Sequence, residues 1–426
     1  MNILWLIGED MGPQIGCYDY PLMRTPNLDR LAGEGAKFTR CFTTAPVCSP
    51  SRSAWNTGMY QTTIGAHHHR SHRKDGYTLP DGVKLISRRL HAAGYFTANV
   101  TGIEPGLQGT GKTDFNFSAG EPFDGTHWNQ RRKDQPFFAQ INFRETHKGP
   151  AFPEARKQQY LVDPKKVPLP PYYPDHPVVR DEFANYLDAM NLLDKKIGRV
   201  LQLLNEEGLA ENTVVFFFGD NGRCLIRGKQ WLYDAGIHIP LMVRWPGVTE
   251  AGRVRDDLVS AIDITATSLA IAGVPLPEKL QGQVMLGPSA ARPRDHIYAA
   301  RDRCDMTVDR IRCIRNKQYK LIRNFMPERP YTQFNAYIEK QYPTLGVMKK
   351  LYAEGKLNET QSLFMQPKKP EYELYDVTTD PHEVNNLAGT VKHKYVMKDL
   401  NGRLGKWIED TDDQGRFPEK EAAQQL

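Results

Sequence analysis

Five short apolar runs along the chain predict the strands of a buried sheet. They lie at residues 3–8, 96–100, 137–143, 213–219 and 240–245, bounded by glycine, aspartate or proline. Near-continuous apolar runs of this length are typical of strands covered on both faces, as in a mainly parallel sheet. The longest nearly uncharged run, residues 213–219, is much shorter than the roughly 20 apolar residues of a membrane-spanning helix, so we expect no such segment.

Helical patterns occupy the segments between these strands. Residues 26–34 have a proline near their start, residues 82–93 end at a glycine, and the apolar positions of residues 183–204 recur on one helical face. A further helix is predicted at residues 262–272. This alternation of strands and helices predicts a doubly wound α/β domain.

The pattern changes near residues 287–294, which are rich in glycine, proline and arginine. Beyond this break, residues 297–300, 310–314 and 319–322 are predicted to form short antiparallel strands, and residues 400–409 a terminal helix. We therefore predict a large domain at residues 1–290 and a smaller α+β subdomain with an antiparallel sheet at residues 291–426. The proline-rich stretch at residues 164–177 is predicted to be a stiff surface loop.

The composition is that of an ordinary globular enzyme. Of 426 residues, 40% are hydrophobic and 25% charged, and 56 Lys+Arg against 50 Asp+Glu leave a net charge of +6. Basic residues crowd residues 301–323, interleaved with aspartates. This segment is either a salt-bridged surface or a wall that contacts an anionic substrate. No recognition motif accompanies it, so nucleic acid is not expected as a partner.

Acidic and amide side chains directly follow two of the predicted strands. Glu9 and Asp10 come after the first strand, and Asp220 and Asn221 follow the strand at residues 213–219. Ligands of open α/β sheets bind at the carboxyl ends of the strands, so the two pairs could converge there. Their oxygens suit Ca²⁺ or Mg²⁺ rather than zinc. Each pair taken alone could instead cap a loop or a helix.

The most specific motif is Cys48-Ser49-Pro50-Ser51-Arg52. It resembles the C-x-P-S-R signature of type I sulfatases, a family of the alkaline phosphatase superfamily in which the cysteine is converted to formylglycine. The resemblance extends along nearly the whole chain. Its further landmarks are Glu9 to Gly12 and residues 25–31, 94–97, 219–222, 228–229 and 373–387.

The resemblance implies an alkaline-phosphatase-like fold, with a large, mostly parallel sheet sandwiched by helices. It also implies a formylglycine nucleophile derived from Cys48 and a divalent cation, with Ca²⁺ favoured over Mg²⁺. The implied metal ligands are Glu9, Asp10, Asp220, Asn221 and the modified Cys48. The implied catalytic residues are Cys48, Arg52 as its anchor, Lys112 and Lys229 on the sulfate oxygens, and His147 as the acid for the leaving group.

Three positions depart from the usual family pattern. Glu9 stands where many sulfatases have aspartate, residues 103–111 form an insertion before Lys112, and Asp114 stands where a second histidine is common. These changes resemble the branch that contains sulfamidase-like and algal-polysaccharide sulfatases. Lys112 is therefore assigned through an insertion.

Variable loops must distinguish one sugar from another, because every member of the family recognises the same sulfate group. The candidate substrate-binding residues are His67, His68, His69, Arg70, His72, Asp114, Arg301, Asp302 and Arg303. A histidine-only metal site is the weaker interpretation of the histidine run, since no carboxylate lies at helical spacing. These polar groups favour an anionic carbohydrate. We expect an exo-acting enzyme on glycosaminoglycan- or ulvan-type sulfated oligosaccharides.

Two other functions remain open from the sequence. One is hydrolysis of phosphomonoesters, phosphodiesters or phosphonate esters, which the same nucleophile and cation could serve. The other is non-catalytic binding of a sulfated glycan, if Cys48 is never converted. A formylglycine-generating maturation enzyme is the expected protein partner, a periplasmic or secreted location is expected, and the sequence indicates no oligomeric state.

Overall fold

The structure, a computed structural model, describes residues 1–72, 75–149, 151–158, 161–417 and 419. Within these residues the large sheet has seven strands in the order β3-β6-β1-β7-β8-β2-β9. Strand β8 is antiparallel to both neighbours, and the other pairs are parallel. The mostly parallel sheet is thus confirmed. The bounds are β1 (Asn2–Gly8), β2 (Ala36–Phe42), β3 (Phe96–Val100), β6 (Phe137–Phe143), β7 (Thr213–Gly219), β8 (His238–Arg244) and β9 (Arg253–Ser260).

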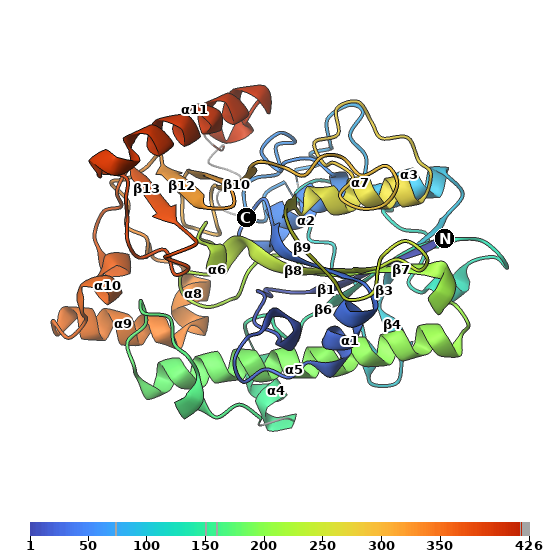
Figure 1. Cartoon of the computed structure of the whole chain (residues 1–426), viewed down its shortest axis with the longest axis horizontal. Coiled ribbons are helices and arrows are strands. Elements are labelled where there is room, and N and C mark those ends of the chain that lie inside the picture. Colours follow the sequence, from blue (N-terminus) through green and yellow to red (C-terminus); the bar gives the residue numbers. More distant parts are fainter. Residues whose placement is uncertain (73–74, 150, 159–160, 418, 420–426) are drawn as a thin grey trace.

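Helices cover both faces of this sheet (Figure 1). One layer contains α1 (Pro26–Glu34), α4 (Ala151–Gln158) and α5 (Pro177–Glu206), and the other contains α2 (Cys48–Thr57), α3 (Ile86–Ala92) and α7 (Ile262–Ile271). Alternate residues of β1 face the two layers, since Leu4 and Leu6 pack in the core with α5 while Ile3 and Trp5 pack with α2, α3 and α7. This explains why the strand is apolar at every position.

Two strands of the large sheet were not expected from the sequence. Strand β2 carries Lys37 and Arg40, and β9 begins with charged residues, so neither is a continuous apolar run. They are the last two strands at one end of the sheet, with β9 at its edge, and several of their side chains are only partly buried or exposed. Helix α5 also begins earlier than predicted, at Pro177, where the side chain of His176 accepts a hydrogen bond from the Val178 amide.

The C-terminal part contains a second, four-stranded antiparallel sheet in the order β10-β11-β12-β13. Its strands are β10 (Ile297–Arg301), β11 (Ile311–Arg315), β12 (Tyr319–Asn324) and β13 (Tyr372–Asp376), and α11 (Lys394–Asp410) packs on it. The antiparallel sheet is confirmed, whereas the domain boundary at residues 290 and 291 stays a prediction. Three helices with little amphipathic signal were missed: α8 (Ala336–Gln341), α9 (Pro343–Ala353) and α10 (Glu359–Ser362).

Short elements connect the two sheets and surround the strand ends. The insertion at residues 103–111 overlaps a small hairpin of β4 (Gly102–Glu104) and β5 (Leu107–Gln108), and α6 (Asp234–Ile237) precedes β8. None of the described helices has the length and apolar character needed to cross a membrane. The carboxyl ends of β1, β6 and β7 lie side by side, because these strands are parallel neighbours. The candidate site is built at this edge.

Candidate active site

The register between β1 and β7 brings together the two pairs of polar residues that follow these strands. Gly8 of β1 lies opposite Gly219 of β7, so Glu9-Asp10 and Asp220-Asn221 leave the sheet at the same level. The Asp10 amide donates a hydrogen bond to Asp220 Oδ1 at 2.7 Å. Asp10 has φ of 53°, a left-handed conformation that costs a non-glycine residue roughly 1 kcal/mol or more. The loop is therefore held in a strained form that points its carboxylate into the site.

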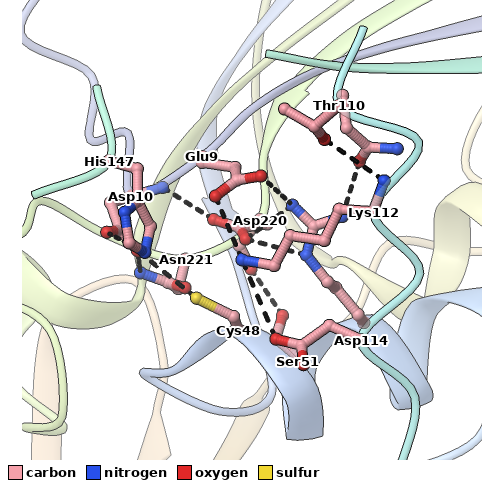
Figure 2. Close-up of polar contacts among 12 residues, drawn as sticks. Glu9, Asp10, Cys48, Ser51, Thr110, Lys112, Asp114, His147, Asp220 and Asn221 are labelled. Carbon is pink, nitrogen blue, oxygen red and sulfur yellow. Dashed lines mark hydrogen bonds and ion pairs between the residues drawn. The ribbon is translucent and has the colours of Figure 1, made fainter. Parts of the chain in front are cut away.

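Cys48 is the first residue of α2 and is completely buried. Its Sγ lies 3.6 Å from Asp10 Oδ1, and ligand atoms of Asp10, Cys48 and Asp220 all lie within 4.8 Å of one another (Figure 2). Burial raises the pKa of the Cys48 thiol to about 11, despite the opposing charges of Lys112 and Lys229. An unmodified Cys48 is thus a neutral thiol and a poor nucleophile at neutral pH.

The oxygen donors beside Cys48 fit a hard cation. Asn221 Nδ2 donates to Asp10 Oδ1 at 3.0 Å and to the Gly222 carbonyl at 2.9 Å. This fixes the amide so that Asn221 Oδ1, which is buried, has no hydrogen-bond partner among the described residues. Glu9 Oε1 is likewise buried without a hydrogen bond in that part of the chain. These two oxygens without hydrogen bonds, together with the carboxylates of Asp10 and Asp220, form a set of donors that could bind Ca²⁺ or Mg²⁺.

Arg52, one turn along α2 from Cys48, is bound to the carboxylates. Its Nε and Nη2 lie 3.0 and 2.8 Å from Asp220 Oδ2, and Nη2 lies 3.7 Å from Glu9 Oε1. Its Nη1 donates to Asn142 Oδ1 at 2.5 Å. The guanidinium, itself fully buried, therefore fixes Asp220 directly, whereas the sequence led us to expect an anchor for the modified Cys48.

Two lysines, Lys112 and Lys229, approach the acidic cluster from separate loops, and Figure 2 shows Lys112. Lys229 Nζ lies 2.8 Å from both oxygens of Asp10, and Lys112 Nζ lies 3.0 Å from Glu9 Oε2. Burial alone would raise the pKa of Asp10, but the neighbouring basic groups, above all Lys229, outweigh it and hold that pKa well below its usual range. The site therefore combines ionised carboxylates with ammonium groups that can bind an anion.

His147 faces the same carboxylate from the end of β6. Its Nε2 lies 3.9 Å from Asp10 Oδ2, and the Glu9 carbonyl accepts a hydrogen bond from the hydroxyl of the neighbouring Thr146. Burial, together with the charges of Lys229 and Lys112, lowers the pKa of His147 to about 4 against the opposing effect of Asp10. The imidazole is neutral at pH 7 in this state, and an anion bound between it and the lysines would raise its pKa.

Comparison with known proteins agrees with this geometry. Residues 1–124 and 109–274 match the sulfatase family, and residues 225–367 match the family described as N-sulphoglucosamine sulphohydrolase, C-terminal. The chain belongs to the sulfatase family. It is therefore a sulfuric ester hydrolase by family, and its site residues can be considered as those of a sulfatase.

Individual relatives cover the sulfatase from end to end. An ulvan-active sulfatase of Formosa agariphila is 35% identical over 472 residues, covering 100% of this chain and 77% of its own. Human N-sulphoglucosamine sulphohydrolase is 26% identical and covers 97% of this chain and 90% of its own. A protein solved in complex with its substrate D-glucosamine-2-N,6-O-disulfate has the same fold, with a TM-score of 0.68, 19% identity, and coverage of 97% and 98%.

The histidine run of the sulfatase reaches the catalytic cluster through one member. His69 Nδ1 lies 2.9 Å from the hydroxyl of Ser49, the neighbour of Cys48, and its Nε2 lies 3.6 Å from Asp305 Oδ1. His67 is buried against His68, whose Nδ1 accepts a hydrogen bond from the Arg303 amide. Of the predicted histidines, His69 thus has the most direct connection to Cys48.

The outer candidates flank this run. His72 Nδ1 lies 2.6 Å from Asp75 and its ring stacks on Tyr77. Arg70 is exposed, and its Nε lies 4.0 Å from Asp114 Oδ1, while Lys112 Nζ lies 3.8 Å from Asp114 Oδ2. Arg70 and Asp114 therefore lie beside a predicted sulfate-binding lysine, and His72 lies farther out.

The basic segment near residue 301 differs from both sequence expectations. Arg301 is buried and donates to Asp309 at 2.9 Å, and Asp302 is buried and lies 3.0 Å from Arg312. Arg303 is bound to Glu419 and donates to the His69 carbonyl at 3.2 Å. These residues form ion pairs in the interior, so they form neither a salt-bridged surface nor a wall of the substrate site. Their burial argues against contact of Arg301 and Asp302 with a sugar.

Sequence reasoning missed several residues that border the site. Asn142 interrupts the apolar run of β6, and that polar residue was the one available signal. Asp305 receives hydrogen bonds from Gln230 at 3.4 Å and Asn335 at 3.2 Å, and the Tyr337 ring centroid lies 5.7 Å from Lys229 Nζ. These residues come from distant segments without a local motif, so only the fold brings them together.

Proposed function

We propose that this sulfatase removes sulfate from a sulfated carbohydrate, through a formylglycine derived from Cys48 and a Ca²⁺ ion. The observation that supports this most is the position of Cys48, buried at the start of α2 beside Asp10, with Lys112, Lys229 and His147 bound to the neighbouring carboxylates. A buried thiol of raised pKa is a poor catalyst in its own right. Its conversion would place an oxygen nucleophile at the centre of this charged pocket.

Glu9, Asp10, Asp220, Asn221 and the converted Cys48 would hold the cation. When bound, the ion supplies positive charge that acidifies a hydroxyl of the hydrated formylglycine and withdraws charge from the sulfate. Ca²⁺ is favoured over Mg²⁺ because the donors are all oxygens and come from flexible carboxylate and amide groups, which suit a larger coordination number.

The remaining residues bind and protonate the substrate. Lys229 and Lys112 bind sulfate oxygens, where negative charge increases as the ester bond breaks. His147 donates a proton to the departing sugar oxygen, and the bound sulfate raises its pKa toward the working range. Arg52 positions Asp220 and so acts through a metal ligand.

The substrate class is supported by the polar groups beside Cys48. His69, Asp305, Gln230 and Asn335 form a connected set of hydrogen-bonding side chains, as expected for sugar hydroxyls. The relatives named above are ulvan-active or act on N-sulphoglucosamine. We propose a glycosaminoglycan- or ulvan-type oligosaccharide, cleaved from a chain end, by an enzyme that works in the periplasm or outside the cell after processing by a formylglycine-generating enzyme.

A panel of defined sulfated disaccharides, intact sulfated polymers, one aryl sulfate and the matching aryl phosphate tests this proposal. Released sulfate or phosphate is quantified for converted wild-type protein and for Cys48→Ala. We expect the highest kcat/KM on a sulfated oligosaccharide and no turnover by the variant. Faster hydrolysis of the phosphate would favour the phosphoester alternative, and a preference for the aryl sulfate over every saccharide would refute the substrate class.

Mass analysis of the Cys48 peptide separates an enzyme from a binding protein. Co-production with a maturation enzyme should give the loss of mass that accompanies conversion of a thiol to an aldehyde. Binding of sulfated glycan by a protein whose Cys48 remains a thiol under these conditions would favour the non-catalytic alternative.

A further inference from the structure

A cavity lined by arginine, histidine and tyrosine side chains lies where residues 13–40 and 223–238 meet residues 315 and 377–383. Its volume is about 350 Å³, and its walls include Tyr20, Tyr172, Arg223, Arg227, His238 and His382. None of the proposed metal ligands or catalytic residues is among the described residues that line it. It is therefore separate from the pocket of Cys48, and nothing in the proposed reaction uses it.

Two arginines of this cavity are buried without an acidic partner. Arg223 and Arg227 are only 7% and 3% exposed. Among the described residues no carboxylate lies within ion-pair distance of either guanidinium, and the Glu383 carboxylate, whose charge acts on Arg227 through space, is held by Lys320 at 2.8 Å. The Nε of each also lacks a hydrogen-bond partner in that part of the chain. A buried guanidinium with unused donors is costly unless an anion or water completes its hydrogen bonds.

Tyr172 connects the two guanidinium groups. Its hydroxyl accepts a hydrogen bond from Arg223 Nη2, and its ring lies 4.7 Å from Arg227 Cζ. Arg227 also stacks on Tyr233 at 3.9 Å and donates to the backbone carbonyl of Glu383. The arginines are thus fixed in place by aromatic rings and neutral acceptors, and neither guanidinium has an ion-pair partner among the described residues.

The charges of all the residues that line the cavity also leave a positive surplus. Its walls contain four arginines and two acids, with the histidines neutral, which leaves a surplus of two positive charges. Of the four, Arg315 is paired with Asp234 and Arg40 with Asp256. The Glu383 carboxylate is bound by Lys320 at 2.8 Å. The surplus therefore belongs to Arg223 and Arg227.

We propose that this cavity binds an oxyanion that carries about two negative charges, through the guanidinium groups of Arg223 and Arg227. Planar guanidinium groups donate paired hydrogen bonds that match sulfate geometry, and the volume suffices for a group of sugar size. The ligand is either free inorganic sulfate or the sulfate groups of a sugar. The site does not depend on conversion of Cys48, so its test and that of the proposed reaction are independent.

Selenate, an anomalous scatterer with the shape and charge of sulfate, provides the direct test. Crystals of the full chain soaked in sodium selenate should show a selenium peak between Arg223 and Arg227. Calorimetric titration with selenate should show that Arg223→Gln binds one anion fewer per chain than wild type. Alternatively, its affinity at that site should be lower than that of wild type by roughly tenfold or more. The matched control is Arg310→Gln, since Arg310 also stacks on an aromatic ring, Phe325, and has an unbonded Nε but does not line the cavity.

The outcomes distinguish the ligand sources and can overturn the proposal. Displacement of selenate from the cavity by glucose 6-sulfate, but not by chloride at equal ionic strength, would identify a sugar sulfate, and failure to displace it would identify the free anion. A peak confined to the Cys48 pocket, or equal affinity in wild type and Arg223→Gln, would overturn the site. If the melting curve shows that Arg223→Gln does not fold, Arg223→Lys replaces it. That variant keeps the charge without the planar fork, and unchanged affinity would again contradict the proposal.

Discussion

At the scale of single residues, the contact between Lys229 and Asp10 determines how the site responds to a cation. Both side chains are buried, and Lys229 Nζ lies 2.8 Å from each Asp10 oxygen. Lys229→Ala leaves Asp10 as an uncompensated buried charge, which should lower the free energy of unfolding of the metal-free protein by about 3–5 kcal/mol. Ca²⁺ should restore much of this loss, because the cation supplies the missing positive charge.

Melting curves in EDTA and in Ca²⁺ measure this effect. The Tm difference between the two conditions should be larger for Lys229→Ala than for wild type, while Lys317→Ala, which removes a lysine from an exposed ion pair, should behave as wild type. An equal Ca²⁺ shift in Lys229→Ala and wild type would contradict a cation beside Asp10.

The contribution of His147 to the rate should increase with the basicity of the leaving group. A sugar alkoxide must be protonated as it departs, whereas an activated phenolate leaves without help, so His147→Ala should lower kcat roughly 100-fold or more on a sugar sulfate and little on an activated aryl sulfate. His91→Gln, an exposed histidine outside the site, is the control. Equal losses on both substrates would assign His147 to sulfate binding rather than to proton transfer.

At the scale of elements, buried ion pairs join the C-terminal sheet to the end of α11. Arg312 of β11 lies between Asp302 and Asp413, at 3.0 and 2.5 Å. Arg312→Met leaves two buried carboxylates without their positive partner. It should lower the free energy of unfolding, measured by denaturant titration, by about 3–5 kcal/mol. The triple change Arg312→Met, Asp302→Asn and Asp413→Asn should recover part of that loss.

Activity measurements on the same proteins test the role of Asp302. With a structural role, Asp302→Asn should leave KM for a sulfated disaccharide close to that of wild type at temperatures where the protein is folded. A large increase in KM without a change in stability would restore Asp302 as a substrate ligand.

The sequence predicted the site better than its surroundings, for physical reasons. Asp10, Asp220 and Asn221 follow apolar strands, and the rule that parallel strands present their carboxyl ends together placed them correctly. The interior pairing of Arg301 and Asp302 could not be read from the sequence, because alternating charges look the same whether they pair in the interior or face water. Asp305 and Tyr337 lie on segments far from Cys48 in the chain, so no local pattern could indicate them.

The same reasoning applies to strands. Runs such as β1 and β7 are apolar at almost every position because helices cover both faces of the sheet, so they were found within one or two residues. Strand β9 lies at the edge of the sheet and β2 lies next to it, and both carry charged residues at partly buried or exposed positions. Their register is set by neighbours distant in the chain. Their signal was therefore absent from the sequence.

At the scale of the whole molecule, buried neutral histidines should make the protein sensitive to acid. Burial lowers the pKa of His68, His147 and His238 to about 4, and that of His67 and His69 well below 6.5. Between about pH 4 and 6.5 the unfolded chain binds more protons than the folded one, so stability must fall as pH falls through this window. Each such histidine contributes up to about 1.4 kcal/mol per pH unit.

Thermal melts in steps of about half a pH unit, from about pH 7.5 to about pH 4.5, measure this dependence. His238→Gln should reduce the slope of unfolding free energy against pH by the equivalent of one proton, and His91→Gln should not. A pH-independent Tm across the window would contradict neutral burial of these side chains.

The central claim is that catalysis depends on an aldehyde at position 48, and one correlation tests it most directly. Preparations made with increasing amounts of maturation enzyme are compared, with the converted fraction of Cys48 measured by peptide mass and the rate of sulfate release measured on one sulfated disaccharide. The rate should rise in proportion to the converted fraction and extrapolate to zero for unconverted protein. A rate that does not change with the converted fraction would contradict the account.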